Sequence, residues 1–267
     1  MTINSDLTTH QYGYGLLHKL HEVQTPTPEI NGLGKFFGTS PLNSEAVSWY
    51  QGLIGEIEVG KILEPLKNKG YIVIHSVPVG EKGSDIDHVV ITPTGLIYVI
   101  NTKHCNGKDV WAGGYVMVNG HKTDFTRNSL FEASRVVKLF AAKELEVEVH
   151  PILVFVHAAK VVTKENAKIK AIKSDELIRY IENEEKKRVK EAKTGFIVPD
   201  YVYDADFWSR GHVDKTGEQE ELWKWFGNLQ SSVKKAQSVK YVWAFTGLAA
   251  VLGALAFGFP AILPLLT

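Results

Sequence analysis

The sequence contains only one cysteine, Cys105, and no excess of charge of either sign. A single cysteine excludes an internal disulfide and a multi-cysteine metal site, and it favours a reducing compartment. Lys plus Arg number 30, as do Asp plus Glu, so the formal net charge is zero. A neutral chain has no global basic field, so any contact with nucleic acid must come from a local patch.

Other features are also missing: internal repeats, low-complexity segments and, at the N-terminus, the charged stretch and apolar run of a secretory signal. The 267 residues suit one sizeable domain with appendages. Helical and strand patterns alternate through residues 44–200, which predicts an α/β domain. Around it we expect an irregular N-terminal arm over residues 1–43, a polar helical linker over 201–240 and a hydrophobic segment over 241–267.

Charged residues are absent from Tyr241 to Thr267. As a helix, the nineteen residues before Pro260 would rise about 28 Å, which is near the hydrocarbon thickness of a bilayer. Lysines precede this segment and none follows it, so we expect a single-pass C-terminal anchor in the cell membrane, with the main domain in the cytoplasm. The alternative is a buried core helix, or a helix that packs on a partner. Small residues four apart would also allow two copies to pair closely as a homo-oligomer.

The segment "DHVVITPTGLIYVIN", residues 87–101, predicts a β-hairpin. With Pro93 at the second turn position and Gly95 in the left-handed conformation, the loop is a type I turn followed by a glycine bulge. Thr92 then faces Leu96, and the residue numbers of every directly opposed pair sum to 188. This register decides which polar side chains meet at the other end of the hairpin.

In this register Asp87 lies across from Asn101, and Asp85 lies across from Lys103. Because side chains alternate along a strand, all four project from one face. The rest of that face is apolar core, made of Val89, Ile91, Ile97 and Val99. Four polar groups therefore converge at one end of an apolar hairpin, close enough to hold one small cation. A slip of one residue would separate Asp87 from Lys103.

The preceding segment, from Asn43 or Ser44 to about Lys69, predicts a helix that supplies a fifth polar group. Its apolar stripe comprises Trp49, Leu53, Gly60 and Leu63, and Glu56 interrupts it. A buried carboxylate is costly unless it is paired or ligates something. Gly60 would allow the helix to approach the sheet closely. From geometry alone, a metal site and a structural salt-bridge cluster around Lys103 remain equal alternatives.

At these residues the sequence resembles the nuclease-related domain family, NERD, a branch of the PD-(D/E)xK nuclease-like fold. The matching motifs span residues 52–157 in the expected order. They are "GEIEVGKILEPL", "DIDHVVITPTGLIYVI", "NTKHCNG", "VNG", "NSLFEA" and "PILVFV". The resemblance implies a mixed sheet flanked by helices and a hydrolase that cuts phosphodiester bonds of DNA with Mg²⁺ or Mn²⁺. Asp87, Asn101, Glu56 and Asp85 would be the metal ligands, and the catalytic set would be Glu56, Asp87, Asn101 and Lys103.

One position departs from the family pattern, because Asn101 occupies the acidic position of the (D/E)xK motif. An amide oxygen can ligate a hard cation but brings no charge, so metal affinity should fall. Either Asp85 supplies the missing charge, or the chain keeps the fold and binds nucleic acid or a protein without cutting. At Glu132 the family often has Gln, and we expect a solvated helix residue there.

The sequence therefore favours a membrane-tethered, metal-dependent nuclease acting on DNA, either as an endonuclease or as an exonuclease. The alternatives are an inactive nucleic-acid-binding or scaffold module on the same fold, and a plain interaction protein whose charged cluster is a salt bridge. Two other candidates are set aside: His88 is predicted to be a core histidine, and Cys105 has no neighbour that would activate a thiol nucleophile.

Overall fold

The computed structural model describes residues 6–7, 10–79, 85–193, 197–209 and 216–253. The chain divides into two compact units, one made of Met1–Lys19 with Ser48–Lys215 and the other of Leu20–Val47 with Thr216–Thr267. The first unit contains both sheets and every predicted site residue. The second is helical.

A five-stranded mixed sheet with the order β1-β2-β3-β7-β9 forms the centre of the first unit. The strands are β1 (Ile72–Pro78), β2 (Asp85–Ile91), β3 (Ile97–His104), β7 (Val149–Val156) and β9 (Lys170–Lys173). β1, β2 and β3 pair antiparallel, whereas β3, β7 and β9 run parallel. The central strands are buried on both faces, as continuous apolar runs such as "ILVFV" predict. The predicted α/β class with a mixed sheet is confirmed.

Four shorter strands form a second sheet in the order β6-β5-β4-β8. They are β4 (Asp109–Ala112), β5 (Val116–Val118), β6 (His121–Thr123) and β8 (Lys160–Thr163). Gly-rich turns separate the first three, because left-handed positions at Asn119 and Gly120 let the chain reverse within two residues.

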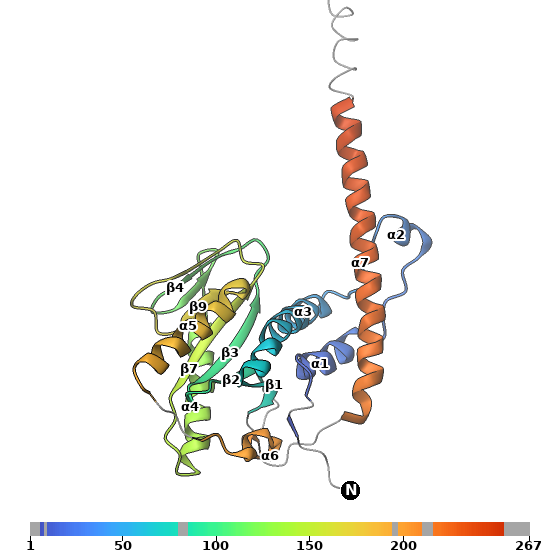
Figure 1. Cartoon of the computed structure of the whole chain (residues 1–267). Helices are drawn as coiled ribbons and strands as arrows, with labels where there is room; N and C mark the ends of the chain where they lie inside the picture. Colours follow the sequence, from blue (N-terminus) through green and yellow to red (C-terminus); the bar gives the residue numbers. More distant parts are fainter. Residues whose placement is uncertain (1–5, 8–9, 80–84, 194–196, 210–215, 254–267) are drawn as a thin grey trace, which may run out of the picture. The chain divides into compact units, whose positions relative to one another are not determined.

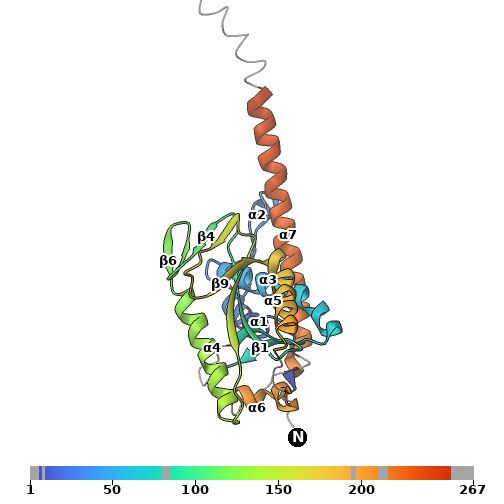
Figure 2. The same cartoon turned by 60° about the vertical axis from the view of Figure 1, so that its left-hand side comes forward.

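Helices cover both faces of the five-stranded sheet (Figure 2). On one face, α3 (Ala46–Leu63) and α5 (Leu177–Lys190) pack on Val90, Tyr98 and Ile100. On the other, α4 (Phe125–Ala141) and α6 (Ala205–Trp208) pack on the opposite side chains of the same strands, including Val89 and Val99. Val89, Ile91, Ile97 and Val99 therefore face α4, and Val90, Tyr98 and Ile100 face α3.

Short helices complete this unit: the 3-10 helices η2 (Glu64–Lys69), η3 (Ser174–Glu176) and η4 (Asp200–Tyr203). Pro65 follows α3 directly, and the segment ends at Gly70 in the left-handed conformation. The N-terminal residues predicted as an irregular arm contain α1 (Tyr14–Gln24) and α2 (Gly32–Phe36). Gly60 of α3 lies against Tyr12 of this N-terminal segment rather than against the sheet. The close approach of α3 to the sheet is made by Gly55, next to Thr102.

The second unit is built on α7 (Thr216–Gly253), a single uninterrupted helix drawn from orange to red in Figure 1. The predicted polar helix and the first part of the hydrophobic segment are thus one element. In the part of the chain that the structure describes, no helix has an apolar stretch long enough to cross a bilayer. The predicted transmembrane helix is not found there, and residues 254–267 of the hydrophobic segment lie outside the described residues.

Candidate active site

The predicted hairpin register holds over the inner half of β2 and β3. Gly95 has a φ of 82°, and Thr92 N–H donates to the Leu96 carbonyl at 2.9 Å, as in the predicted turn. Four opposed pairs follow, from Ile91–Ile97 to His88–Ile100, and the residue numbers of each sum to 188. The expected outer pairs, Asp87–Asn101 and Asp85–Lys103, are wrong, because the ladder ends at His88.

The two strands part beyond His88, while each stays paired with its other neighbour. Ile86 and Asp85 pair with β1, whereas Asn101 to His104 pair with β7. The Asp87 carboxylate bridges the opening by accepting the backbone N–H of Thr102 at 2.6 Å. A side chain thus satisfies the donor that backbone pairing leaves free.

Asp87 also lacks a backbone partner on β1. The β1–β2 pairing skips Ser76, the residue that faces Asp87, and Ser76 has a φ of 47°. Such a conformation is strained for a residue with a side chain, and strain of this kind gathers at functional sites. Ser76 is fixed by the N-terminal segment, since its hydroxyl oxygen accepts the Tyr14 N–H at 2.9 Å.

Glu56 of α3 reaches Asp87 at this opening. Its side chain is buried, and its carboxyl donates a hydrogen bond to the Asp87 carboxylate. Burial first, and then the charge of Asp87, raises the pKa of Glu56 well above its ordinary value, while Lys103 opposes the shift. Burial also raises the pKa of Asp87. The raised pKa values favour a pair in which one carboxyl group keeps its proton and shares it with the other.

Asp85 is the first residue of β2 and lies against Gly15, near the start of α1. A Cβ atom added to Gly15 would stand 2.3 Å from Asp85 Oδ2, so a larger residue there would displace the Asp85 carboxylate. Burial, followed by the charge of Asp87, raises the pKa of Asp85 to about 7. The N-terminal segment thus lies against Asp85 at Gly15 and near Glu56 at Gly13, a position that no local sequence pattern indicates.

Lys103 is the cation nearest these carboxylates, yet it makes no ion pair with a described residue. Its ammonium donates to the Thr102 carbonyl at 3.0 Å and lies 5.5 Å from the centre of the Phe125 ring. It lowers the pKa values of Glu56 and Asp87 through space without a direct contact. A closed salt bridge around Lys103, the structural alternative, is not what the geometry shows.

Asn101 is buried, and its side-chain amide donates a hydrogen bond to the Glu132 carboxylate on α4. The expectation that Glu132 is a solvated helix residue is therefore wrong. Burial raises the pKa of Glu132, with a smaller contribution from Asp87. Glu132 belongs to the same charged group, and the sequence could not place it because nothing local shows which face of α4 meets β3.

The donor set suits a hard divalent cation in its chemistry. Four acids (Glu56, Asp85, Asp87 and Glu132) have raised pKa values, and Lys103 acts on three of them, Glu56, Asp87 and Glu132. Their oxygen atoms are the ligands that Mg²⁺ and Mn²⁺ prefer. A bound cation would relieve this surplus of buried acid. Among the described residues, no three His, Cys, Asp or Glu side chains already stand in a metal-binding arrangement.

The remaining candidates take no part in this cluster. His88 is fully buried and pairs with Ile100, so the prediction of a core histidine is confirmed. Cys105 is buried, and burial raises the pKa of its thiol, which makes it a poor nucleophile.

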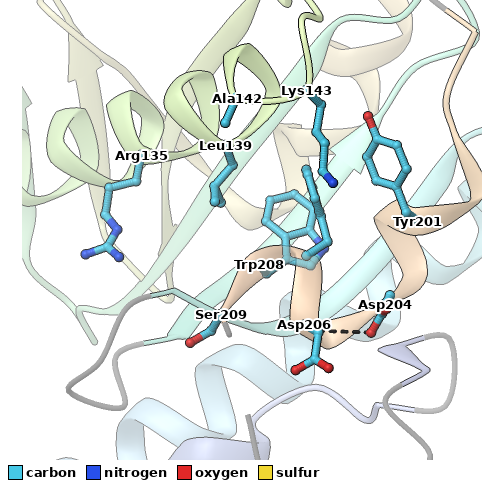
Figure 3. Close-up of a pocket in the computed structure, with 10 residues that line it drawn as sticks. Arg135, Leu139, Ala142, Lys143, Tyr201, Asp204, Asp206, Trp208 and Ser209 are labelled. Carbon is cyan, nitrogen blue, oxygen red and sulfur yellow. Dashed lines mark hydrogen bonds between the residues drawn. The ribbon is translucent and has the colours of Figure 1, made fainter. Parts of the chain in front are cut away.

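A cavity of about 520 Å³ lies elsewhere in the first unit, between α4 and the segment of η4 and α6 (Figure 3). Arg135, Lys143, Tyr201 and Trp208 are among its lining residues, and none of the predicted site residues reaches it. The acidic cluster is therefore separate from this cavity.

Comparison with known proteins identifies the segment that carries the cluster. Residues 51–156 match the family model of the nuclease-related domain, NERD. Comparisons with curated proteins and with solved structures found no match. The matched segment includes all five predicted site residues and Glu132, which lie on α3, β2, β3 and α4. The resemblance is confirmed by this match of residues 51–156 to the nuclease-related domain, which is consistent with the PD-(D/E)xK-like nuclease superfamily.

Proposed function

We propose that this chain is a metal-dependent nuclease that hydrolyses phosphodiester bonds of DNA. One observation carries the proposal: the hydrogen-bonded carboxyl groups of Glu56 and Asp87, with Lys103 nearby, stand where β2 and β3 part. Burying several acids around an opening in a sheet lowers stability, and a function that needs them accounts for the arrangement.

The chemistry divides between a cation and the protein. A bound Mg²⁺ or Mn²⁺ supplies Lewis acidity, which polarises the scissile phosphate and lowers the pKa of a water molecule. Asp87, Glu56 and the Asn101 carbonyl oxygen would hold it, with Asp85 as a further acid. The Thr102 N–H fixes the Asp87 carboxylate. The Lys103 ammonium, free of any ion pair with a described residue, would attract the phosphate and offset the negative charge that develops on it.

The test is cleavage of plasmid and linear DNA by the full chain with Mg²⁺ or Mn²⁺. Cleavage should stop with EDTA and fall about 100-fold or more in the Lys103→Ala variant, which loses the cation nearest the carboxylates. Lys186→Ala, at an exposed position of α5, is the matched control and should cut as the parent does. Cleavage that survives Lys103→Ala would refute the assignment of this site.

A second function is favoured by Asn101, which brings no charge at the position of the motif acid. On this proposal the domain binds nucleic acid at the same face without cutting. The result that would establish it is DNA binding by the parent without cleavage, together with cleavage by Asn101→Asp.

We also propose that the second unit attaches the chain to a membrane. Residues 241–253 carry no charge and expose large apolar side chains, among them Tyr241, Phe245 and Leu252. Trp243 packs on Phe36 and Phe37, and all three side chains are exposed. Exposed aromatic side chains of this kind are typical of the level of the lipid headgroups. Alkaline extraction of membranes tests the proposal, and release of the full chain into the supernatant would refute a spanning anchor. If the released chain forms soluble dimers, the apolar surface instead pairs with a second copy.

A further inference from the structure

The pair formed by Asn101 and Glu132 contains the acid that residue 101 lacks. Asn101 donates its side-chain N–H to the Glu132 carboxylate, so one member of the pair is a carboxamide and the other a carboxylate. Asn101 can offer a cation only its carbonyl oxygen, because its NH₂ group is a donor, here used on Glu132. The carboxylate stands one hydrogen bond away, on α4.

Exchanging the two functional groups would leave the shape of the pair unchanged. Asp and Asn have the same size, as do Glu and Gln, so an acid on the strand and an amide on the helix would form the same hydrogen bond with donor and acceptor reversed. The total charge of the pair would also be the same. The strand acid expected from the motif is therefore replaced by an acid on the facing helix, without a change in volume.

Glu132 lies within the electrostatic reach of the cluster. Its carboxyl group is affected by the charges of both Asp87 and Lys103, the two groups at the centre of the proposed site. It is partly buried, and its one side-chain hydrogen bond to a described residue is that from Asn101. No lysine or arginine of the described residues forms an ion pair with it, so its negative charge is left for another cation.

We propose that Glu132 is the acidic metal ligand of this domain, in place of residue 101, for a hard divalent cation such as Mg²⁺ or Mn²⁺. This inference rests on the proposed metal-dependent function and specifies which residue provides its third acid. It competes with the alternative that Asp85, at the end of β2, makes up the missing charge.

Binding of Mn²⁺ to the full chain, measured by the loss of the free Mn²⁺ electron paramagnetic resonance signal, tests the inference without measuring activity. Glu132→Gln should weaken Mn²⁺ binding about 10- to 100-fold, because one ligand charge is lost from the site. The double variant Asn101→Asp/Glu132→Gln, which exchanges the two groups, should restore the affinity of the parent. Glu146→Gln, at an exposed position beyond α4, is the matched control and should bind as the parent does.

Three results would overturn the inference, and they differ in what else they imply. If the parent binds no Mn²⁺, the metal-dependent function fails together with it. If the parent binds Mn²⁺ and Glu132→Gln binds equally well, only the role of Glu132 fails. If Asp85→Asn loses Mn²⁺ while Glu132→Gln keeps it, Asp85 is the replacement acid. Circular dichroism of each variant confirms that a loss of binding is not a loss of fold.

Discussion

Replacing Glu56 by Gln should change how the stability of the cation-free protein depends on pH. Glu56 is buried and its pKa is raised well above 4.5, so the folded chain holds a proton that the unfolded chain releases. The contribution of Glu56 to the free energy of unfolding is therefore largest in acid and falls as pH rises toward its folded-state pKa. For one proton the slope is about 1.4 kcal/mol per pH unit. Gln cannot titrate, and its amide can donate to Asp87 as the protonated carboxyl does.

The two proteins should thus have similar stability near pH 5, and Glu56→Gln should become the more stable as pH rises, by at most about 1.4 kcal/mol per pH unit. Urea unfolding in EDTA, repeated at several pH values, measures this difference. Glu146→Gln is again the control and should follow the parent at every pH. Parallel curves for the parent and Glu56→Gln would refute the description of Glu56 and Asp87 as a pair that shares a proton.

Two further predictions concern groups around the site. Gly60→Ala should destabilise the protein by about 1–3 kcal/mol, because the new Cβ would lie 2.4–2.6 Å from Tyr12 carbons. The control is Gly52→Ala in the same helix. Its new Cβ meets only the flexible end of Leu16, so this variant should be neutral or gain up to about 1 kcal/mol of stability. Thermal unfolding compares the two, and equal effects would contradict the packing of Tyr12 on α3. Burial lowers the pKa of His88 well below 6.5, so only the unfolded chain takes up that proton and stability should fall as pH drops below about 6.5. His88→Asn should have a shallower acid slope in urea unfolding, and an unchanged slope would contradict the assignment.

The hairpin could be predicted from local chemistry because few conformations suit "TPTG". Pro93 fixes one backbone angle and Gly95 accepts the left-handed conformation, so the turn sets the register of the strands on either side. The same reasoning could not show where pairing stops. The ladder between β2 and β3 ends at His88, although β2 stays paired with β1 and β3 with β7. These pairings connect residues far apart in the sequence.

The parts of the site that sequence reasoning missed come from other elements. Glu132 is part of the site because α4 lies on the face of β3 that carries Asn101. The helical pattern of the sequence does not predict which strand this helix packs against. Gly15 of the N-terminal segment lies against Asp85. A glycine in a sequence indicates only a turn or a close approach and does not predict which residue it contacts. Gly60 was assigned the wrong partner for the same reason. Local pattern thus predicts elements and turns, whereas the composition of the cluster depends on tertiary packing.

The most direct test of the account is anomalous diffraction from crystals of the full chain grown with Mn²⁺. The central claim is that the carboxylates where β2 and β3 part hold a divalent cation. The account predicts an anomalous peak within about 2.5 Å of a carboxylate oxygen of Asp87, with Glu56 and Glu132 beside it. A peak only at other residues, or none in Mn²⁺-saturated crystals, would contradict the claim.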